Sequence, residues 1–399
     1  MKEDYKNCLK YIRAKWAKLT FHNTQDHDVH IGLPNKFVAP GAKRGIFRDD
    51  QFYWDSYFII LGLIEAKKID LAKGIVDNFA YLQKRFGIIP LRNRFFNLGS
   101  SQPPFLSSMT LEVYGVTKDK RWLRKMAEVI EKELQGYWMD RKKAEKHLIY
   151  SGLSRYCDHH INHITAEHES GWDMTSRFEN RCLDFLPIDL NSLLYKYETD
   201  LIQIHMILKN EEKVKKYEQQ ANIRKKRINR LMWSRSRQFF FDYDYHNKKR
   251  KYFYSLAAFY PLWANLATPM QAKKCRDNLK RFEYKHGLAN TQKQVFKRFR
   301  QWDYPNGWPN QQWIVIRGLL NYGYQKDAKR LAKKWLNLNC HVFNETGKLW
   351  EKYNVVTGGI GQQGRYPNQT GFGWTNAIFL KLAHWLAKEE MQQNKRCPL

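Results

Sequence analysis

The sequence predicts an all-α protein in which helical hairpins close into a barrel or toroid. Helical periodicity recurs along most of the 399 residues, strand patterns are confined to one short region, and no linker rich in Pro, Gly or Ser divides the chain. The loops that carry candidate chemistry are far apart in sequence, and a closed fold would bring them together. We therefore expect a single catalytic domain over residues 1–399, with an N-terminal helical extension over 1–34 that packs on it.

The individual helices follow from apolar residues spaced three and four positions apart. From Leu190 to Leu208 such residues form one buried stripe, and Asp189 before it is a suitable N-cap. The same spacing predicts helices over 9–20, 111–138, 190–208, 211–233, 270–282, 311–322, 326–338 and 373–388. Alternating apolar residues predict one minor β-hairpin, with strands over 238–245 and 251–254 and a turn at 245–248.

The chain is strongly basic, with 69 Lys and Arg against 39 Asp and Glu and a formal net charge of +30. The basic residues are spread along the whole length, and no zinc-finger, RNP or basic-zipper pattern is present. We therefore expect no nucleic-acid partner. The charge is interpreted as a solvated basic face, with an anionic substrate such as a sugar phosphate or a sugar acid as the alternative.

Cysteine usage and hydropathy bear on location. The six cysteines are scattered without a Cys-x-x-Cys pair, which is typical of free thiols in a reducing compartment. The N-terminus has no apolar core of a signal peptide, and no apolar run is long enough to span a bilayer. These observations predict a cytoplasmic protein that has no contact with a membrane; we also expect a monomer.

Two acidic residues in aromatic, Gly-rich segments indicate a glycosidase. Asp173 follows Glu169-Ser170-Gly171-Trp172, and Glu351 lies between Trp350 and Lys352. Two carboxyl groups can break a glycosidic bond without a cofactor, because one protonates the leaving oxygen while the other activates water or attacks the anomeric carbon. A neighbouring Trp stacks on a sugar and raises the pKa of a carboxyl group towards a value useful for proton donation.

Five loop segments combine Trp or Tyr with Asp, Asn, Gln or Arg, the combination that a sugar requires for its apolar faces and its hydroxyl groups. They span residues 45–57, 87–104, 169–178, 301–309 and 351–376.

In their order and spacing, these segments resemble the trehalase family of glycoside hydrolases, from about residue 35 to residue 385. The matching motifs are Trp54-Asp55-Ser56-Tyr57, Ser101-Gln102-Pro103-Pro104, Glu169-Ser170-Gly171-Trp172-Asp173, Asp189-Leu190-Asn191, Pro261-Leu262-Trp263-Ala264, Gln301-Trp302-Asp303-Tyr304-Pro305, Glu351-Lys352-Tyr353 and Gly371-Phe372-Gly373-Trp374-Thr375-Asn376. The resemblance implies an (α/α)6 toroid and inverting hydrolysis of an α-glucoside, first of all α,α-trehalose to two glucose molecules. No cofactor or metal is implied.

The resemblance also implies roles for single residues. Asp173 falls on the general acid of the family and Glu351 on its general base, with a gap of roughly 6.5–9.5 Å between the carboxyl groups to seat a water molecule. The implied sugar-binding residues are Arg48, Trp54, Asp55, Gln102, Arg177, Trp302, Asp303, Arg365 and Trp374.

Several family motifs are altered in this chain. An Arg-Ser-Gln-Pro-Pro motif becomes Ser100-Ser101-Gln102-Pro103-Pro104, and the Gly-Gly-Glu-Tyr after the base becomes Gly364-Arg365-Tyr366, so a cation replaces a carboxylate. Arg365 and Arg92 could meet an anionic group. The alternatives are therefore a related hydrolase of a glycosylglycerate or an α-glucosidic oligosaccharide, or an inactive protein on the same fold that binds sugar or nucleic acid.

Two smaller patterns are given other interpretations. Metal-ligating residue types gather at Asp158, His159, His160, His163, Glu167 and His168, but the His-Glu-x-x-His order of a zinc hydrolase is absent, so we expect polar surface. Gly358-Gly359-Ile360-Gly361 lacks the Gly-Lys-Ser/Thr of a phosphate loop and is interpreted as a lid over the sugar site.

Overall fold

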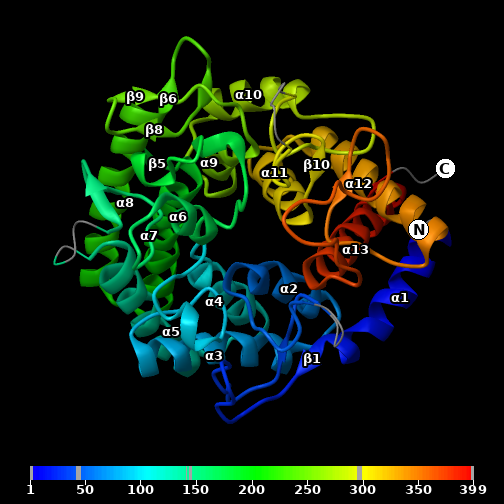
Figure 1. Ribbon diagram of the computed structural model, residues 1–399, viewed down its shortest axis with the longest axis horizontal. Helices are drawn as coiled ribbons and strands as arrows, with labels where there is room; N and C mark the ends of the chain where they lie inside the picture. Colours follow the sequence, from blue (N-terminus) through cyan, green and yellow to red (C-terminus); the bar gives the residue numbers. More distant parts are fainter. Residues whose placement is uncertain (1–2, 42–45, 141, 143–145, 294–298, 397–399) are drawn as a thin grey trace.

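Two concentric rings of helices form the protein, as the computed structural model shows for residues 3–41, 46–140, 142, 146–293 and 299–396 (Figure 1). Each inner helix contacts the next, and the last contacts the first, which closes the ring. The inner helices are α2 (Tyr53–Glu65), α4 (Leu106–Thr117), α7 (Ile188–Leu208), α9 (Tyr260–Trp263), α11 (Pro309–Asn321) and α13 (Gly373–Arg396). The outer helices are α1 (Glu3–Leu19), α3 (Ile69–Phe86), α5 (Lys120–Glu133), α8 (Glu211–Met232), α10 (Pro269–Asp277) and α12 (Gln325–Thr346). This is the (α/α)6 toroid that the resemblance implied.

The two rings differ in how much of each helix is buried. In α2, every residue from Tyr53 to Leu63 is buried, whereas α5 buries one stripe made of Trp122, Leu123, Met126, Ala127 and Ile130. Close packing in the inner ring requires small residues: a Cβ atom on Gly62 of α2 would lie 2.4 Å from the Cα of Ala377 in α13. The outer helices are amphipathic because their other face meets solvent.

The N-terminal helix is part of the outer ring. α1 packs on α12 and α13, the last outer and inner helices, so the first helix of the chain lies beside the last two (Figure 1). The strand pair β1 (Thr20–Phe21) and β2 (Phe37–Val38) then leads the chain towards α2.

Some predicted boundaries are wrong. The helix expected over 111–138 is divided into α4 and α5, because Lys118 adopts a left-handed conformation and Asp119 caps α5 by accepting a hydrogen bond from the backbone N–H of Trp122. Residues 53–57, expected in a loop, form the first turns of α2. That helix is apolar on all sides and shows no amphipathic period.

The single β-hairpin expected over 238–254 is two short antiparallel pairs. They are β6 (Trp233–Ser234) with β7 (Phe239–Phe240), and β8 (Tyr243–Asp244) with β9 (Lys249–Arg250). β8 also pairs with β5 (Phe185–Leu186). The predicted turn at 245–248 connects β8 to β9, while residues 251–254 are not in a strand.

Two further antiparallel pairs lie in the connecting loops: β3 (Leu148–Tyr150) with β4 (Leu153–Ser154), and β10 (Asn306–Gly307) with β11 (Tyr353–Asn354). The second of these joins the loop that carries Trp302 to the loop that carries Glu351. Within the described residues, no helix is both long enough and apolar enough to cross a membrane.

Candidate active site

A cavity of about 440 Å³ is formed by the loops and first helical turns at one end of the inner ring. Its volume lies in the range of small-molecule sites. Of the residues implied by the resemblance, it brings together Trp54, Asp55, Gln102, Asp173, Trp302, Glu351, Arg365 and Trp374. The remaining lining residues are Pro40, Phe47, Phe52, Leu91, Arg92, Phe96, Asn97, His168, Gly171, Trp308, Tyr366 and Phe372.

The segment that carries Asp173 is held against α2 and against the loop at 301–303. Gly171 has φ +73°, and a Cβ atom there would lie 2.6 Å from the indole of Trp54, so only glycine fits without a shift. The side chain of Gln301 donates to the backbone carbonyl of Asp173. The backbone N–H of Trp302 donates to the carbonyl of Met174 at 3.2 Å. Asp173 is thus fixed from both sides.

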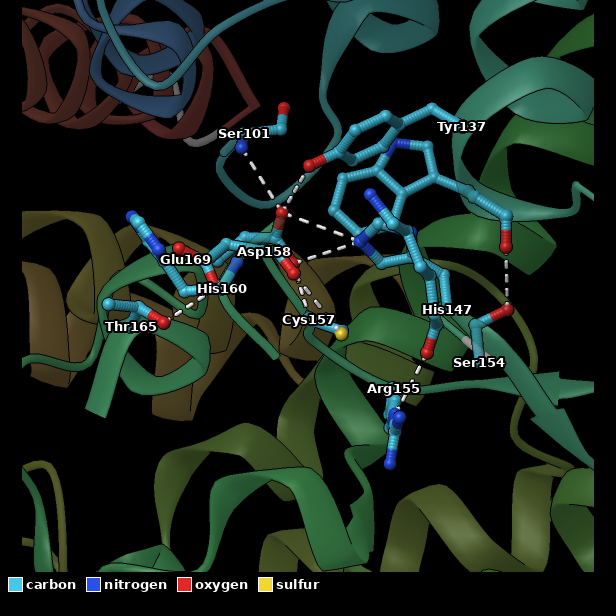
Figure 2. Close-up of polar contacts among 12 residues, drawn as sticks. Ser101, Tyr137, His147, Ser154, Arg155, Cys157, Asp158, His160, Thr165 and Glu169 are labelled. Carbon is cyan, nitrogen blue, oxygen red and sulfur yellow. Dashed lines mark hydrogen bonds and ion pairs between the residues drawn. The ribbon is translucent and has the colours of Figure 1, made fainter. Parts of the chain in front are cut away.

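A buried carboxylate anchors the start of the same segment (Figure 2). Glu169 at the end of α6 (His163–Glu169) accepts hydrogen bonds from the Tyr137 hydroxyl at 2.5 Å, the Cys157 N–H at 2.6 Å and the Ser101 N–H at 3.1 Å. His147 Nε2 lies 3.1 Å from Oε2 of Glu169. Glu169 is fully buried, so these partners replace water around the carboxyl group. Its role is to position the segment of Asp173, four residues further on.

The electrostatic environment favours the protonated form of Asp173 up to near-neutral pH. Burial raises the pKa of Asp173 to about 7, against a smaller opposing effect of Arg365, whose Nη1 lies 3.4 Å from Asp173 Oδ2. Burial, followed by the charge of Glu351, also raises the pKa of Asp55 well above its ordinary value. These influences favour the protonated form of Asp55, whose carboxyl group lines the cavity.

Two donors bind the carboxyl group of Glu351. The Tyr366 hydroxyl donates to Oε1 at 2.8 Å, and Lys352 Nζ lies 3.0 Å from Oε2. Both Glu351 and Lys352 are buried. The backbone N–H of Glu351 donates to the Gln369 carbonyl at 3.0 Å, and Trp374 Nε1 donates to the Glu351 carbonyl at 3.4 Å. The loop before α13 and the first turn of that helix therefore hold the backbone of Glu351.

Four indole rings form an aromatic wall in this cavity. Trp302 stacks on Trp308 with ring centroids 4.0 Å apart and an interplanar angle of 3°. Trp54 lies 5.5 Å from Trp302, and Trp374 meets Trp308 edge to face at 5.8 Å. Such a wall excludes water and presents flat apolar faces to a sugar ring.

Two implied residues lie behind the cavity wall. Arg177 is fully buried, where its guanidinium pairs with Asp189 at 2.7 Å and with Asp242 at 2.6 Å. Asp303 accepts from Thr175 Oγ1 at 2.7 Å and from the Ser176 N–H at 3.0 Å. Neither lines the cavity, and both stabilise the backbone that follows Asp173.

Arg48 does not line the cavity either; its side chain is exposed, while the neighbouring Phe47 lines it. Residues 42–45, at the start of the first predicted loop segment, lie outside the described residues. The predicted lid at 358–361 is held by backbone bonds between Gly359 and Asn354 and between Gly361 and Lys352, and none of its residues lines the cavity.

Several lining residues were absent from the sequence-based set of sugar-binding residues. Trp308 lies in the quoted segment 301–309, and Tyr366 follows the altered position 365. Proximity in sequence to the predicted residues is the feature that could have identified Trp308 and Tyr366 as lining residues. Phe47 and Phe52 lie in the quoted segment 45–57, and Phe96 lies in the segment 87–104, but a Phe is most often a core residue, so its type did not single it out.

The group of metal-ligating residue types is only partly assembled. Asp158, His159 and His160 have ligand atoms within 4.8 Å of one another. Asp158 Oδ1 already accepts from the Thr165 hydroxyl at 2.5 Å and from the His160 N–H at 3.1 Å (Figure 2). His168 lies apart from this group, at the cavity, with its Nε2 2.8 Å from Arg365 Nη1.

An (α/α)6 toroid with paired carboxyl groups and an aromatic wall in one cavity defines the class of protein as a glycoside hydrolase. Comparisons with known proteins make the assignment specific: the Trehalase family profile matches residues 1–165 and 165–386. The chain therefore belongs to the trehalase family.

Relatives support this membership in sequence and in structure. The periplasmic trehalases of Escherichia coli O1:K1 and of Shigella flexneri serotype 5b are each 32% identical to this chain, over 96% of it and 74% of their own length. The neutral trehalase Nth1 of Saccharomyces cerevisiae superposes with a TM-score of 0.79 at 28% identity, covering 94% of this chain and 80% of that one. A GH63 mannosylglycerate hydrolase of Thermus thermophilus shares the fold, with a TM-score of 0.69 at 20% identity over 87% and 95% of the two chains.

These relatives correct the predicted location. The cytoplasmic assignment is wrong, because the curated relatives are periplasmic trehalases. The cysteine argument behind it fails for a physical reason. Cys397 lies outside the described residues, and the other five cysteines are buried thiols that form no disulfide, so their scatter along the sequence does not indicate the redox compartment.

Proposed function

We propose that this chain hydrolyses an α-glucoside with inversion at the anomeric carbon, and that α,α-trehalose is cleaved to two glucose molecules. The observation that carries the proposal is the contrast between two carboxyl groups in one cavity. Asp173 has a pKa raised to about 7 by burial, whereas Glu351 is held between a hydroxyl and an ammonium group. One group is suited to donate a proton and the other to accept one.

The reaction follows from these two environments. Asp173 donates its proton to the glycosidic oxygen as the bond to the anomeric carbon breaks. Glu351 accepts a proton from a water molecule, which attacks the opposite face of the same carbon. The Trp wall holds the glucose ring, and the carboxyl group of Asp55 accepts from a sugar hydroxyl and, in its protonated form, also donates to one.

The stereochemistry of the products tests the proposal. Proton NMR during the first minutes of trehalose cleavage is expected to show α- and β-glucose in equal amounts, because only the attacked residue inverts. Release of α-glucose alone would overturn inversion. Asp173→Asn and Glu351→Gln are each expected to lower kcat by at least a thousandfold. Activity that survives in both variants would remove these two residues from the mechanism.

A further inference from the structure

Arg365 is a positive charge beside the proton donor. Its Nη1 lies 3.4 Å from Asp173 Oδ2, and Asp173 is the one carboxyl group among the described residues within ion-pair distance of it. Asp173 must be protonated to act, so in the reactive state it no longer neutralises Arg365. The other neighbour, His168, lies 2.8 Å away, and burial followed by the charge of Arg365 lowers the pKa of His168 to about 4. That imidazole is therefore neutral as well.

Arg92 adds a second positive charge to the same cavity. Its Nη1 lies 3.1 Å from Asp50 Oδ2, but Arg94 also binds that carboxylate, through Nε at 2.7 Å and Nη2 at 2.9 Å. Two guanidinium groups thus share one buried carboxylate, which leaves one positive charge in excess. Arg92 lines the cavity, whereas Arg94 does not.

The excess charge lies where the leaving group must sit. Asp173 protonates the glycosidic oxygen, which departs with the leaving group, so a side chain against Asp173 faces that part of the substrate. Arg365 is about half exposed, at the mouth of the cavity. The guanidinium of Arg92 is oriented by the rings of Phe52 and Phe96, whose centroids are 5.3 and 5.4 Å from it. The charge of Arg365 is among the influences that lower the pKa of Arg92, after burial, so the two cations are electrostatic neighbours.

We propose that the preferred substrate carries an anionic group, a phosphate or a carboxylate, on its leaving group, and that Arg92 and Arg365 bind this group. An anion between the two guanidinium groups relieves their repulsion and takes the place of the charge that Asp173 loses on protonation. Guanidinium groups match phosphate and carboxylate through paired N–H donors. The inference rests on the function proposed above and extends it to the choice of substrate.

Pairs of substrates that differ only in the anion test the proposal. Trehalose is compared with trehalose 6-phosphate, and α-glucosylglycerol with α-glucosylglycerate, by glucose release at low salt. We expect kcat/KM to be at least tenfold higher for one or both anionic members, and this preference to shrink as salt is added. The phosphate pair and the carboxylate pair together identify which anion is recognised.

Variants assign the preference to the two arginines. Arg365→Gln is expected to lower the anionic-to-neutral ratio of kcat/KM by about tenfold, and Arg92→Gln to do the same where thermal unfolding shows that it folds. The control is Arg121→Gln, which removes an equal charge from the exposed face of α5 and should leave the ratio unchanged. Neutral and anionic substrates cleaved equally well would overturn the inference and leave the proposed function standing. Cleavage of none of the four would overturn the proposed function itself.

Discussion

The hydroxyl of Tyr366 donates a 2.8 Å hydrogen bond to Oε1 of Glu351, across 15 residues of sequence. Burial, followed by the charge of Glu351, raises the pKa of Tyr366 well above its ordinary value, so the hydroxyl remains a donor throughout the neutral range. The ring also lies against Phe47, with centroids 5.1 Å apart, which fixes its orientation. The acceptor of the proton in the proposed reaction is thus held by a residue outside the sequence-predicted set.

Tyr366→Phe removes this donor and little else. A hydrogen bond to a charged group contributes roughly 1.5–3 kcal/mol, so kcat should fall about tenfold to a hundredfold. The ring and its contact with Phe47 are retained, and the thermal unfolding temperature should change little. Steady-state kinetics on trehalose measures the effect. An unchanged kcat would show that this hydroxyl does not support the proposed base.

The pH dependence of cleavage follows from the pKa of Asp173, which burial raises to about 7. The proposed donor is protonated below that value, so kcat/KM should fall about tenfold for each pH unit above 7. Arg365 opposes the raised pKa. Arg365→Gln should therefore move the alkaline limb to higher pH, whereas the remote change Arg121→Gln should leave it in place. A limb that stays where it was in Arg365→Gln contradicts the electrostatic coupling between Arg365 and Asp173.

The raised pKa of Asp173 also predicts that this residue lowers the stability of the folded protein at alkaline pH. Because the pKa of Asp173 in the folded state lies above its ordinary value of 3.8, the folded state binds the proton more tightly. The stabilisation of the folded state by the protonated Asp173 is complete below pH 3.8 and is lost as the pH rises through 7. Asp173→Asn should therefore be inactive and yet more stable than the wild type at pH 8, with a smaller difference at pH 5. Urea unfolding at the two pH values measures it; a less stable variant at pH 8 contradicts the desolvation argument.

Sequence periodicity located helices of both rings, such as α7, α8 and α12, but it missed the inner helix α2 and the amphipathic outer helix α3. That inner helix is buried on all sides, so its sequence carries no amphipathic period. α9 covers only Tyr260–Trp263 and is too short to show one. The same periodicity located the inner helices α7, α11 and α13, so the missed helices are not confined to one ring.

The residues of the candidate site were likewise predicted only in part. The matching motifs predict that Trp54, Asp173, Glu351 and Trp374 lie in one pocket, because the order of the segments carries that information. The same motifs include Arg177, which lies behind the wall. A motif match predicts only that a residue lies near the site. It does not separate a side chain that lines the cavity from one that holds the backbone beneath it.

Gly171 and Gly87 offer a matched test of the fit between the acid segment and α2. Both adopt left-handed φ angles, +73° and +74°, so an alanine at either position costs about 1 kcal/mol in backbone strain. At Gly87 the added Cβ meets nothing within 4 Å, whereas at Gly171 it lies 2.6 Å from Trp54. Gly87→Ala should lose only the strain. Gly171→Ala should be further destabilised by roughly 1–3 kcal/mol and lose most activity, because Asp173 is displaced. Equal urea midpoints for the two variants would contradict this packing.

Arg177 is predicted to contribute to the free energy of unfolding and not to bind the sugar directly. Arg177→Gln leaves two buried carboxylates, Asp189 and Asp242, without their shared cation, which should cost about 3–5 kcal/mol. The control is Arg85→Gln on the surface, where a 34% exposed side chain pairs with Asp26, and about 1 kcal/mol or less is expected. Urea unfolding separates the two. A raised KM with an unchanged urea midpoint in Arg177→Gln would instead indicate a direct sugar contact.

Cys8 in α1 and Cys340 in α12 have sulfur atoms 3.5 Å apart, although 332 positions separate them in sequence. Formation of a bond of about 2.05 Å needs only a small approach of the two helices. Oxidised glutathione should therefore convert the two thiols to a disulfide, with both protons and electrons passing to the oxidant. The bridge would close the outer ring near the chain ends and stabilise the protein by about 2–4 kcal/mol.

Thermal unfolding with and without the oxidant, together with mass spectrometry of the unreduced protein, measures this effect. The unfolding temperature should rise after oxidation and return after reduction with a dithiol. Cys8→Ala should abolish the rise, whereas Cys275→Ala, which removes a buried cysteine of α10, should retain it. If both thiols still react with an alkylating reagent when the oxidised sample is unfolded, the two helices do not approach closely enough for the bridge. A bridge of this kind would suit a protein whose curated relatives work in the periplasm, where disulfides persist.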